Sequence, residues 1–156
     1  MNQPVTINRR IIEALYSEAL VLSDEVRSAF DLSGRPERGE ANASAAAQTA
    51  RVELSSEALR TTTRMMHALA WLLNQRAYLA GELSELQLRR YGQLPPDRPV
   101  GETGAADLIS PEVRRLVRET RQFYARLQRL DRDWREPDVR PPVAALRERI
   151  GSALAR

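Results

Sequence analysis

Residues that could carry out nucleophilic or acid–base chemistry are few in this chain. His67 is the single histidine, cysteine is absent, and no G-x-S-x-G nucleophile elbow occurs. No Glu-x-x-His pair is present, so a zinc or di-iron centre would lack its usual ligands. The GETG sequence at Gly101 lacks the preceding strand that a phosphate-binding loop needs. The sequence therefore predicts no enzyme, no metal site and no cofactor.

Arginine is the abundant charged residue, because all 24 basic residues are arginine. They are interspersed with 21 acidic residues, which leaves a formal charge of +3 and no strong single-sign field. One segment near the C-terminus is the richest: Arg114, Arg115, Arg118, Arg121, Arg126, Arg129, Arg132 and Arg135. Surface ion pairing on a solvated helix is the simpler interpretation, and a phosphate-facing strip that binds nucleic acid is the alternative.

The composition is that of an ordinary globular protein. Of 156 residues, 42% are apolar and 29% charged, and the chain is long enough for one domain with a core. No apolar run approaches the roughly 20 residues of a membrane span. The opening MNQPVTINRR is polar and does not resemble a secretory signal. We expect a cytoplasmic protein that does not bind membranes.

Three long segments have helical periodicity, and none reads as a strand. They cover about residues 7–32, 52–80 and 111–136, and a short extension covers 84–91. Gly81 is placed to stop the second helix, and Ser110 followed by Pro111 is a helix start. The alanine-rich stretch before residue 49 is either a loop or a lead-in to the second helix. We predict an all-α domain over residues 1–136, an antiparallel three-helix bundle with a long central helix.

Two segments rich in proline lie outside these helices. Residues 92–109 form a connection longer than most compact domains use, and such loops are usually functional or mobile. Residues 137–156 form a separate tail, either a short amphipathic helix or a flexible segment. Its apolar edge, a candidate contact surface, consists of Val143, Leu146, Ile150 and Leu154.

The segment 52–80 has an unusually wide apolar surface. On a helical wheel, Met66, Ala70, Leu73 and Ala77 lie within about 40° of Leu59, and further apolar residues widen this arc on one side. A surface helix needs a stripe only somewhat wider than about 100°. We therefore expect this helix to be central, with its core side along this arc and a surplus that suits a subunit interface.

Two polar residues, Thr62 and Arg76, fall inside the predicted apolar arc. A threonine hydroxyl can bond a carbonyl one turn back. A guanidinium in the core needs an acidic partner, because an unpaired buried charge is strongly destabilising. The candidates for Arg76 are Asp131, Glu82 and Asp24.

The opposite side of the same segment combines aromatic and basic residues. It contains Arg60, Arg64, His67, Trp71 and Tyr78. Tryptophan, tyrosine and arginine dominate the energetics of protein interfaces. This side is a candidate interface with a second subunit or partner, although another part of the same chain could equally cover Trp71.

The residues of this segment resemble a known family pattern. They are Glu57, Arg60, Thr62, Thr63, Arg64, Met66, Trp71, Leu72, Leu73, Gln75, Arg76, Ala77, Gly81 and Glu82. The pattern E-S-x-R-L-T-T-R-L-M-Q-x-A-S-W-L-L-x-Q-R-A, followed by Gly-Glu, is that of the regulator of CtrA degradation (RcdA) family. Tyr124 to Leu127 and Arg129 to Asp131 resemble that family's closing L-Y-x-R-x-x-R-L-D. The chain departs from the pattern at Thr61, His67 and Ala70, where the family has leucine, glutamine and serine.

The resemblance implies an all-helical homodimer of the bacterial cytoplasm that acts without catalysis. Members of that family are adaptors or scaffolds that help the ClpXP protease degrade the cell-cycle response regulator CtrA, together with other accessory proteins. It also implies a flexible, proline-containing C-terminal tail. The alternatives are a basic helical protein that associates with nucleic acid and a purely structural dimerisation module.

Overall fold

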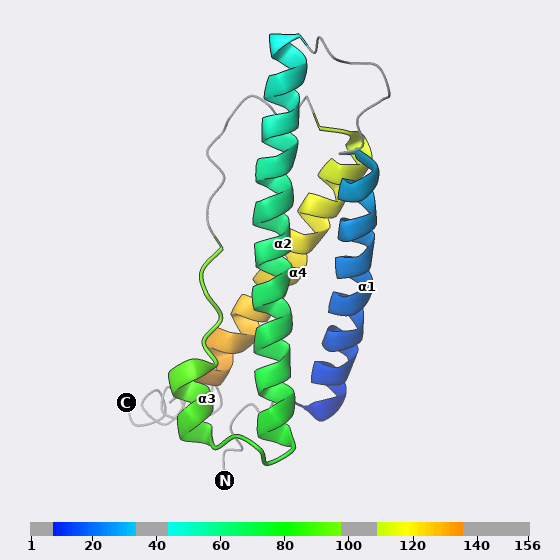
Figure 1. Ribbon diagram of the computed structural model, residues 1–156. Helices are drawn as coiled ribbons and strands as arrows, with labels where there is room; N and C mark the ends of the chain where they lie inside the picture. The colour runs from blue at the N-terminus through cyan, green and yellow to red at the C-terminus, as the bar shows by residue number, and fades with distance from the viewer. Residues whose placement is uncertain (1–7, 34–43, 98–108, 136–156) are drawn as a thin grey trace, which may run out of the picture.

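The computed structural model describes residues 8–33, 44–97 and 109–135, and within them it contains four helices and no strand (Figure 1). The helices are α1 (Arg9–Ser33), α2 (Ala45–Leu79), α3 (Glu85–Tyr91) and α4 (Pro111–Arg135). The described part of the chain is therefore all-α, as predicted. The predicted tail, with Val143, Leu146, Ile150 and Leu154, lies outside the described residues.

Helix α1 forms where apolar residues recur every three or four positions. Asn8 precedes it, and the Asn8 Oδ1 accepts a hydrogen bond from the Arg10 backbone N–H at 2.9 Å, which satisfies a donor that the first turn leaves free. The buried residues are Ile12, Leu15, Ala19, Leu22, Val26 and Ala29. This stripe confirms the first predicted helix.

Helix α2 begins at Ala45, well before the predicted start at residue 52. Ser44 is its N-cap, and the Ser44 Oγ accepts a hydrogen bond from the Ala47 N–H at 3.3 Å. Alanine has the highest helix propensity. The alanine-rich stretch can therefore extend the helix even though it buries little surface. Of the two alternatives for this stretch, the lead-in is correct from Ala45 onward. No described helix, α2 included, has the length and apolar character that a membrane crossing requires.

The end of α2 and the start of α3 follow from local capping. Gly81 has a φ of 79°, a conformation that glycine adopts without strain. Its N–H bonds the Tyr78 carbonyl at 3.0 Å, and the Glu82 N–H bonds the Ala77 carbonyl at 2.9 Å, which is the Schellman pattern. Ser84 and Gln87 then form a capping box that opens α3. The predicted stop and the short extension are both confirmed.

Helix α4 begins as predicted. The Ser110 Oγ accepts a hydrogen bond from the Val113 N–H at 3.3 Å, and Pro111 occupies the first helical position. One side of the helix is buried: Val113, Leu116, Val117, Thr120, Phe123, Tyr124, Leu127 and Asp131. Thr120 and Asp131 are the polar members of this stripe, and both contact α2.

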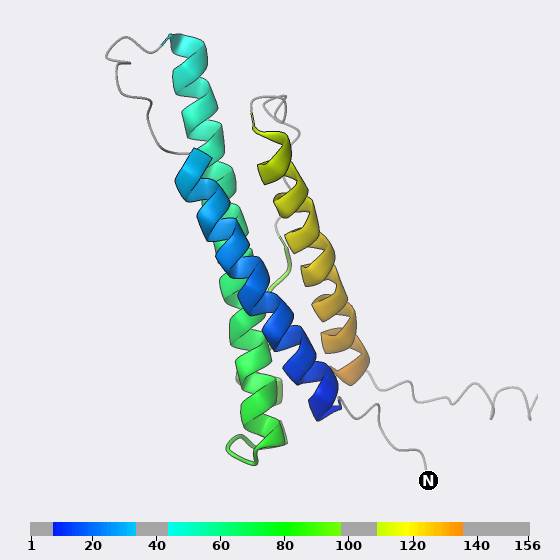
Figure 2. The same cartoon turned by 90° about the vertical axis from the view of Figure 1, so that its right-hand side faces the viewer.

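The directions of the long helices differ from the predicted antiparallel bundle. Helices α1 and α2 are antiparallel, but α4 runs in the same direction as α2 (Figures 1 and 2). Contacts between α2 and α4 agree, since Arg64 bonds Thr120 and Trp71 bonds Asp131 further along both helices. The prediction of antiparallel neighbours is therefore wrong for this pair. The physical reason is the long connection after α3, which must return the chain to the other end of α2 before α4 can begin.

The prediction of which side of α2 faces the core is also wrong for the residues at the centre of the predicted apolar arc. Leu59, Met66 and Leu73 are 70%, 63% and 47% exposed, and Ala70 is exposed as well. The residues that are buried are Glu57, Thr61, Arg64, Met65, Ala68, Trp71, Leu72 and Gln75. The prediction placed the core by hydrophobicity alone. Most of the polar residues on the buried side have hydrogen-bond or ion-pair partners, so their burial does not require an apolar side chain.

Candidate functional site

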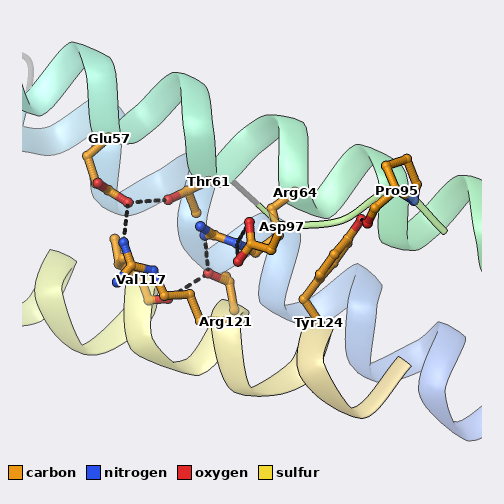
Figure 3. Close-up of polar contacts among 9 residues, drawn as sticks. Glu57, Thr61, Arg64, Pro95, Asp97, Val117, Arg121 and Tyr124 are labelled. Atoms are coloured by element: carbon orange, nitrogen blue, oxygen red, sulfur yellow. Dashed lines mark hydrogen bonds and ion pairs between the residues drawn. The ribbon is translucent and has the colours of Figure 1, made fainter. Parts of the chain in front are cut away.

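A network of buried polar side chains joins α2 and α4. Its centre is Arg64, whose side chain is 2% exposed. The Arg64 Nε donates to both carboxylate oxygens of Asp97 at 3.2 and 3.1 Å, and an Arg64 terminal nitrogen donates to the Thr120 hydroxyl at 3.1 Å (Figure 3). Thr120 in turn donates to the Val117 carbonyl at 2.8 Å. A buried guanidinium is tolerated here because its donors have acceptors.

The network continues about two turns earlier along α2, at the buried Glu57. Thr61 donates a hydrogen bond to the Glu57 carboxylate at 3.3 Å. Arg121 of α4 lies 3.7 Å from the same carboxylate (Figure 3). Arg60 of α2 lies at the same distance of 3.7 Å from it. Glu57 therefore links α2 to α4 at a second level. We call Glu57, Thr61, Arg64, Asp97, Thr120 and Arg121 the polar network.

Asp131 is the centre of a second group of buried contacts. The Trp71 indole N–H donates to one Asp131 oxygen at 2.8 Å, and the Arg135 Nε donates to the same oxygen at 2.9 Å. The Leu94 backbone N–H donates to the other oxygen at 3.4 Å. One carboxylate therefore connects α2, α4 and the chain after α3.

Tyr124 holds the same stretch of chain through its hydroxyl. The Tyr124 hydroxyl donates to the Pro95 carbonyl at 2.6 Å (Figure 3). Burial raises the pKa of Tyr124 to about 12, and the nearby Asp97 charge adds to this shift. The phenol is therefore a neutral donor across the ordinary pH range.

These contacts share one effect, which is to fix residues Gly92–Asp97 against α2 and α4. We call this segment the strap. Leu94 is buried in the core, while Pro95 and Asp97 accept bonds from α4 and α2. The family-like residues Arg64 and Trp71 thus act as positioning residues for the strap. Each of these groups holds structure, and none is arranged with a nucleophile and a base.

The predicted interface residues do not lie on one exposed face. Arg64 and Trp71 are in the interior, so for Trp71 the alternative of cover by the same chain is correct. Arg60 is exposed and His67 is half-buried. Tyr78 packs edge-on against Trp134, with ring centroids 6.3 Å apart. Hydrogen bonding by the Trp71 indole and the Arg64 guanidinium explains why they are inside.

The two polar residues of the predicted arc are not in the core either. Thr62 is exposed. Arg76 is partly exposed and pairs with Glu13 of α1 at 2.9 Å, with its guanidinium 4.5 Å from the centre of the Tyr16 ring. None of the three predicted partners is correct. The antiparallel packing of α1 against α2 places Glu13 opposite Arg76.

Sequence reasoning missed Asp97 and Thr120, the partners of Arg64. Asp97 follows two prolines in the long connection, where it was not treated as a partner for α2. A carboxylate in an otherwise apolar and proline-rich stretch, LPPD, was the available signal. Thr120 lies among the buried residues of α4, and its position in the sequence gives no information on the partner of its hydroxyl.

The exposed side of α2 has a line of apolar residues along its centre, with Arg51 and Arg60 beside it. Val52, Leu59, Met66 and Leu73 are separated by seven residues each and are all exposed. The exposed positions between them on this side include Ser55, Thr62, Thr63 and Ala70. We call this set of residues the α2 face. A shallow hollow of about 350 Å³ lies between Val52 and Leu59, lined by Arg51, Ser55 and Ser56.

The arginines of α4 are mostly engaged in ion pairs. Arg115 pairs with Glu119 at 2.8 Å, and Arg126 pairs with Glu18 of α1. Arg121 and Arg135 belong to the contacts described above. Arg118, Arg129 and Arg132 have no acidic partner within residues 8–33, 44–97 and 109–135. The same residues contain no cluster of three or more groups that could hold a metal ion.

The fold and these contacts define an all-α protein in which buried polar groups set the arrangement of the helices. The chain belongs to the family described as "Protein of unknown function (DUF1465)", whose model matches residues 4–154. No curated protein and no solved structure matches it.

Proposed function

We propose that this protein is a non-enzymatic, cytoplasmic scaffold that acts as a dimer of three-helix bundles in regulated proteolysis. Its activity is to bring a protease of the ClpXP type and a response regulator of the CtrA type together with their accessory proteins. The likeness of α2 and α4 to the RcdA family pattern supports the choice of process. The observation that carries the scaffold role is the α2 face.

The α2 face has the properties of a helix-docking surface. Its four large apolar residues repeat every seven positions over about 32 Å of helix, which is the spacing of a coiled-coil seam. Small residues between them permit close approach of another helix, and the hollow between Val52 and Leu59 resembles a hole for an incoming side chain. A second helix that covers these exposed apolar side chains would remove their surface from water, and this burial stabilises the complex.

A second copy of the chain is the occupant that we assign to this face. A two-fold axis brings the same surface of each subunit together, so a charged stripe would repel its own copy. The line from Val52 through Leu73 has no charged residue on it. The dimer would then present two copies of each remaining surface, which raises the effective concentration of bound partners. In this mechanism the segment 137–156 is the second contact surface.

Reconstituted degradation tests the proposal. Purified ClpXP, the response regulator and the accessory proteins of the same bacterium are mixed with the wild-type protein, with Met66→Asp, or with Leu86→Asp. Leu86 is an exposed leucine on α3 and serves as the matched control. We expect faster loss of the regulator with the wild type and Leu86→Asp, and little acceleration with Met66→Asp. Equal rates with and without the wild-type protein would contradict the proposal.

A nucleic-acid role is the second candidate, and it is favoured by Arg118, Arg129 and Arg132, which have no acidic partner in the part of the chain that the structure describes. Phosphate binding by such residues releases counterions, so the affinity should fall steeply with salt. A shift assay with duplex DNA at two salt concentrations separates the candidates. Binding that weakens strongly with salt and is lost on combined Arg118→Gln and Arg129→Gln substitution would favour nucleic acid.

A further inference from the structure

A cleft lies between α2 and the strap, beside the α2 face, and it shares Leu59 and Thr63 with that face. It has a volume of about 560 Å³, which is within the usual range for ligand pockets. Its lining is of two kinds. Leu59, Pro95 and Pro96 provide apolar surface, and Arg60, Arg64 and His67 provide cationic or hydrogen-bonding groups from α2.

The structure already places one carboxylate in this cleft. Asp97 of the strap binds the Arg64 Nε through both of its oxygens (Figure 3). The Asp97 side chain is 31% exposed, whereas the Arg64 side chain is 2% exposed. A carboxylate that approaches from the solvent side of the strap therefore fits the cleft and meets a basic side chain on α2.

Two further groups at the cleft have donors that are not committed to a close acceptor. Arg60 is 45% exposed, and its distance of 3.7 Å to the Glu57 carboxylate is too long for a hydrogen bond. His67 makes no hydrogen bond or ion pair with any residue of the described ranges. Arg60 lies four residues before Arg64 and His67 lies three residues after it, so the three side chains are neighbours on the surface of α2.

We propose that this cleft binds an acidic peptide segment of a partner protein. A carboxylate of the peptide is held by Arg60 and His67, and a neighbouring apolar side chain packs against Pro95 and Pro96, on the strap side of the cleft and away from the dimer seam. Asp97 remains on Arg64 and closes the inner end of the cleft. This inference rests on the proposed scaffold role, because it names a contact surface through which the dimer would hold a partner.

Charge complementarity favours this occupant over others. The cleft has two guanidinium groups and one carboxylate, and this carboxylate is already neutralised by the buried Arg64. A basic peptide would meet Arg60 with like charge, and a purely apolar one would leave the donors of Arg60 and His67 unpaired. A peptide with an acidic side chain beside an apolar one can pair with the donors of α2 and also pack against the prolines of the strap.

Fluorescence anisotropy with a labelled peptide of defined sequence tests the proposal. The probe is an acetylated, amidated peptide Leu-Asp-Leu-Asp-Leu, and its comparison peptide has asparagine in place of both aspartates. We expect saturable binding of the aspartate peptide to the full chain, and roughly tenfold weaker binding of the asparagine peptide, as loss of a charged hydrogen bond implies. Arg60→Gln and His67→Gln should each weaken binding of the aspartate peptide.

Arg118→Gln is the matched control, because Arg118 is an exposed arginine on α4 outside the cleft. It should leave binding unchanged, and circular dichroism should show that all three variants remain folded. The inference is overturned by equal affinity for the two peptides, by no saturable binding, or by equal losses in Arg118→Gln and Arg60→Gln. If peptide binding fails while Met66→Asp still abolishes dimer formation and accelerated degradation, the cleft is wrong and the scaffold role stands.

Discussion

The two sides of α2 reverse the usual distribution of residue types. The side that faces the interior contains Glu57, Thr61, Arg64 and Gln75 among its buried residues, whereas the side that faces solvent contains Leu59, Met66 and Leu73. The interior is stable with polar residues because most of them have defined partners. The exposed apolar residues have no such compensation within the described chain. The difference teaches that burial on α2 depends on specific partners as well as on hydrophobicity.

The inner side of α2 explains the arrangement of the remaining elements. Arg64 and Trp71 connect α2 to points distant in the sequence, namely Asp97, Thr120 and Asp131. These connections fix the position of the strap and the parallel direction of α4. Substitutions on this side should therefore change stability, and substitutions on the outer side should change association.

The largest effect is expected at Trp71. Trp71→Ala removes a fully buried ring and leaves a cavity, which costs about 3–5 kcal/mol of the free energy of unfolding. It also deprives Asp131 of one donor. Urea denaturation measures the change, with Leu86→Ala as a control expected to stay within about 0.5 kcal/mol of the wild type. A Trp71→Ala protein as stable as this control would contradict an interior position for the ring.

The polar network provides the next largest effect. Asp97→Asn leaves the buried Arg64 guanidinium without its carboxylate, and removal of one partner from a buried pair costs about 3 kcal/mol or more. We expect a lower urea midpoint and faster proteolysis of the strap. If the urea midpoint of Asp97→Asn equals that of the wild type, Arg64 is not held by Asp97 in solution.

Tyr124 predicts a dependence of stability on alkaline pH. The unfolded tyrosine ionises near its ordinary pKa of about 10, whereas the folded phenol titrates at about 12. Between these values the unfolded state binds fewer protons, so the free energy of unfolding falls as the pH rises. Denaturation at several pH values should show this fall in the wild type and in Tyr91→Phe, where the tyrosine is exposed.

Tyr124→Phe should remove most of that alkaline decrease. It also removes the hydrogen bond to the Pro95 carbonyl, which costs about 1 kcal/mol at neutral pH. Ultraviolet titration of the phenolate provides an independent reading of the same group. A wild-type protein in which all tyrosines ionise together near the ordinary pKa would show that Tyr124 is not buried.

The smallest effect is expected at the ion pair between Arg76 and Glu13. Both side chains are substantially exposed, at 39% and 46%, so Glu13→Gln should cost less than about 1 kcal/mol. Comparison of the losses in the free energy of unfolding for Glu13→Gln and Asp97→Asn separates the contribution of an exposed ion pair on α2 from that of a buried one. A loss at Glu13 as large as the loss at Asp97 would remove the distinction between the two sides of α2.

The helices and most of their ends, although not the start of α2 at Ala45, could be predicted from the sequence because they depend on local features. The stripe of α1, the stop at Gly81 and the start at Ser110 are each determined by residues within a turn or two. The interior side of α2 could not be predicted by hydrophobicity, because Arg64 is buried by virtue of Asp97 and Thr120. These residues lie 33 and 56 positions away in the sequence. The parallel direction of α4 likewise depends on the path of a long connection.

The candidate contact surfaces show the same limit. Arg60, Arg64 and His67 were predicted to lie on one outward face of α2; all three line the cleft beside the strap, but Arg64 is buried. Trp71 and Tyr78 were assigned to that group because aromatic residues are frequent in interfaces. Their intrachain partners, Asp131 and Trp134, come from α4 and could not be identified from α2 alone.

Sedimentation velocity of the purified full-length chain tests the central claim most directly, namely that the α2 face is a contact surface between two copies. We predict a dimer for the wild type and for Leu86→Asp, and a folded monomer for Met66→Asp, because a carboxylate at the middle of an apolar seam would be buried without a partner. A wild-type monomer at high protein concentration, or a Met66→Asp dimer as stable as that of the wild type, would contradict the account.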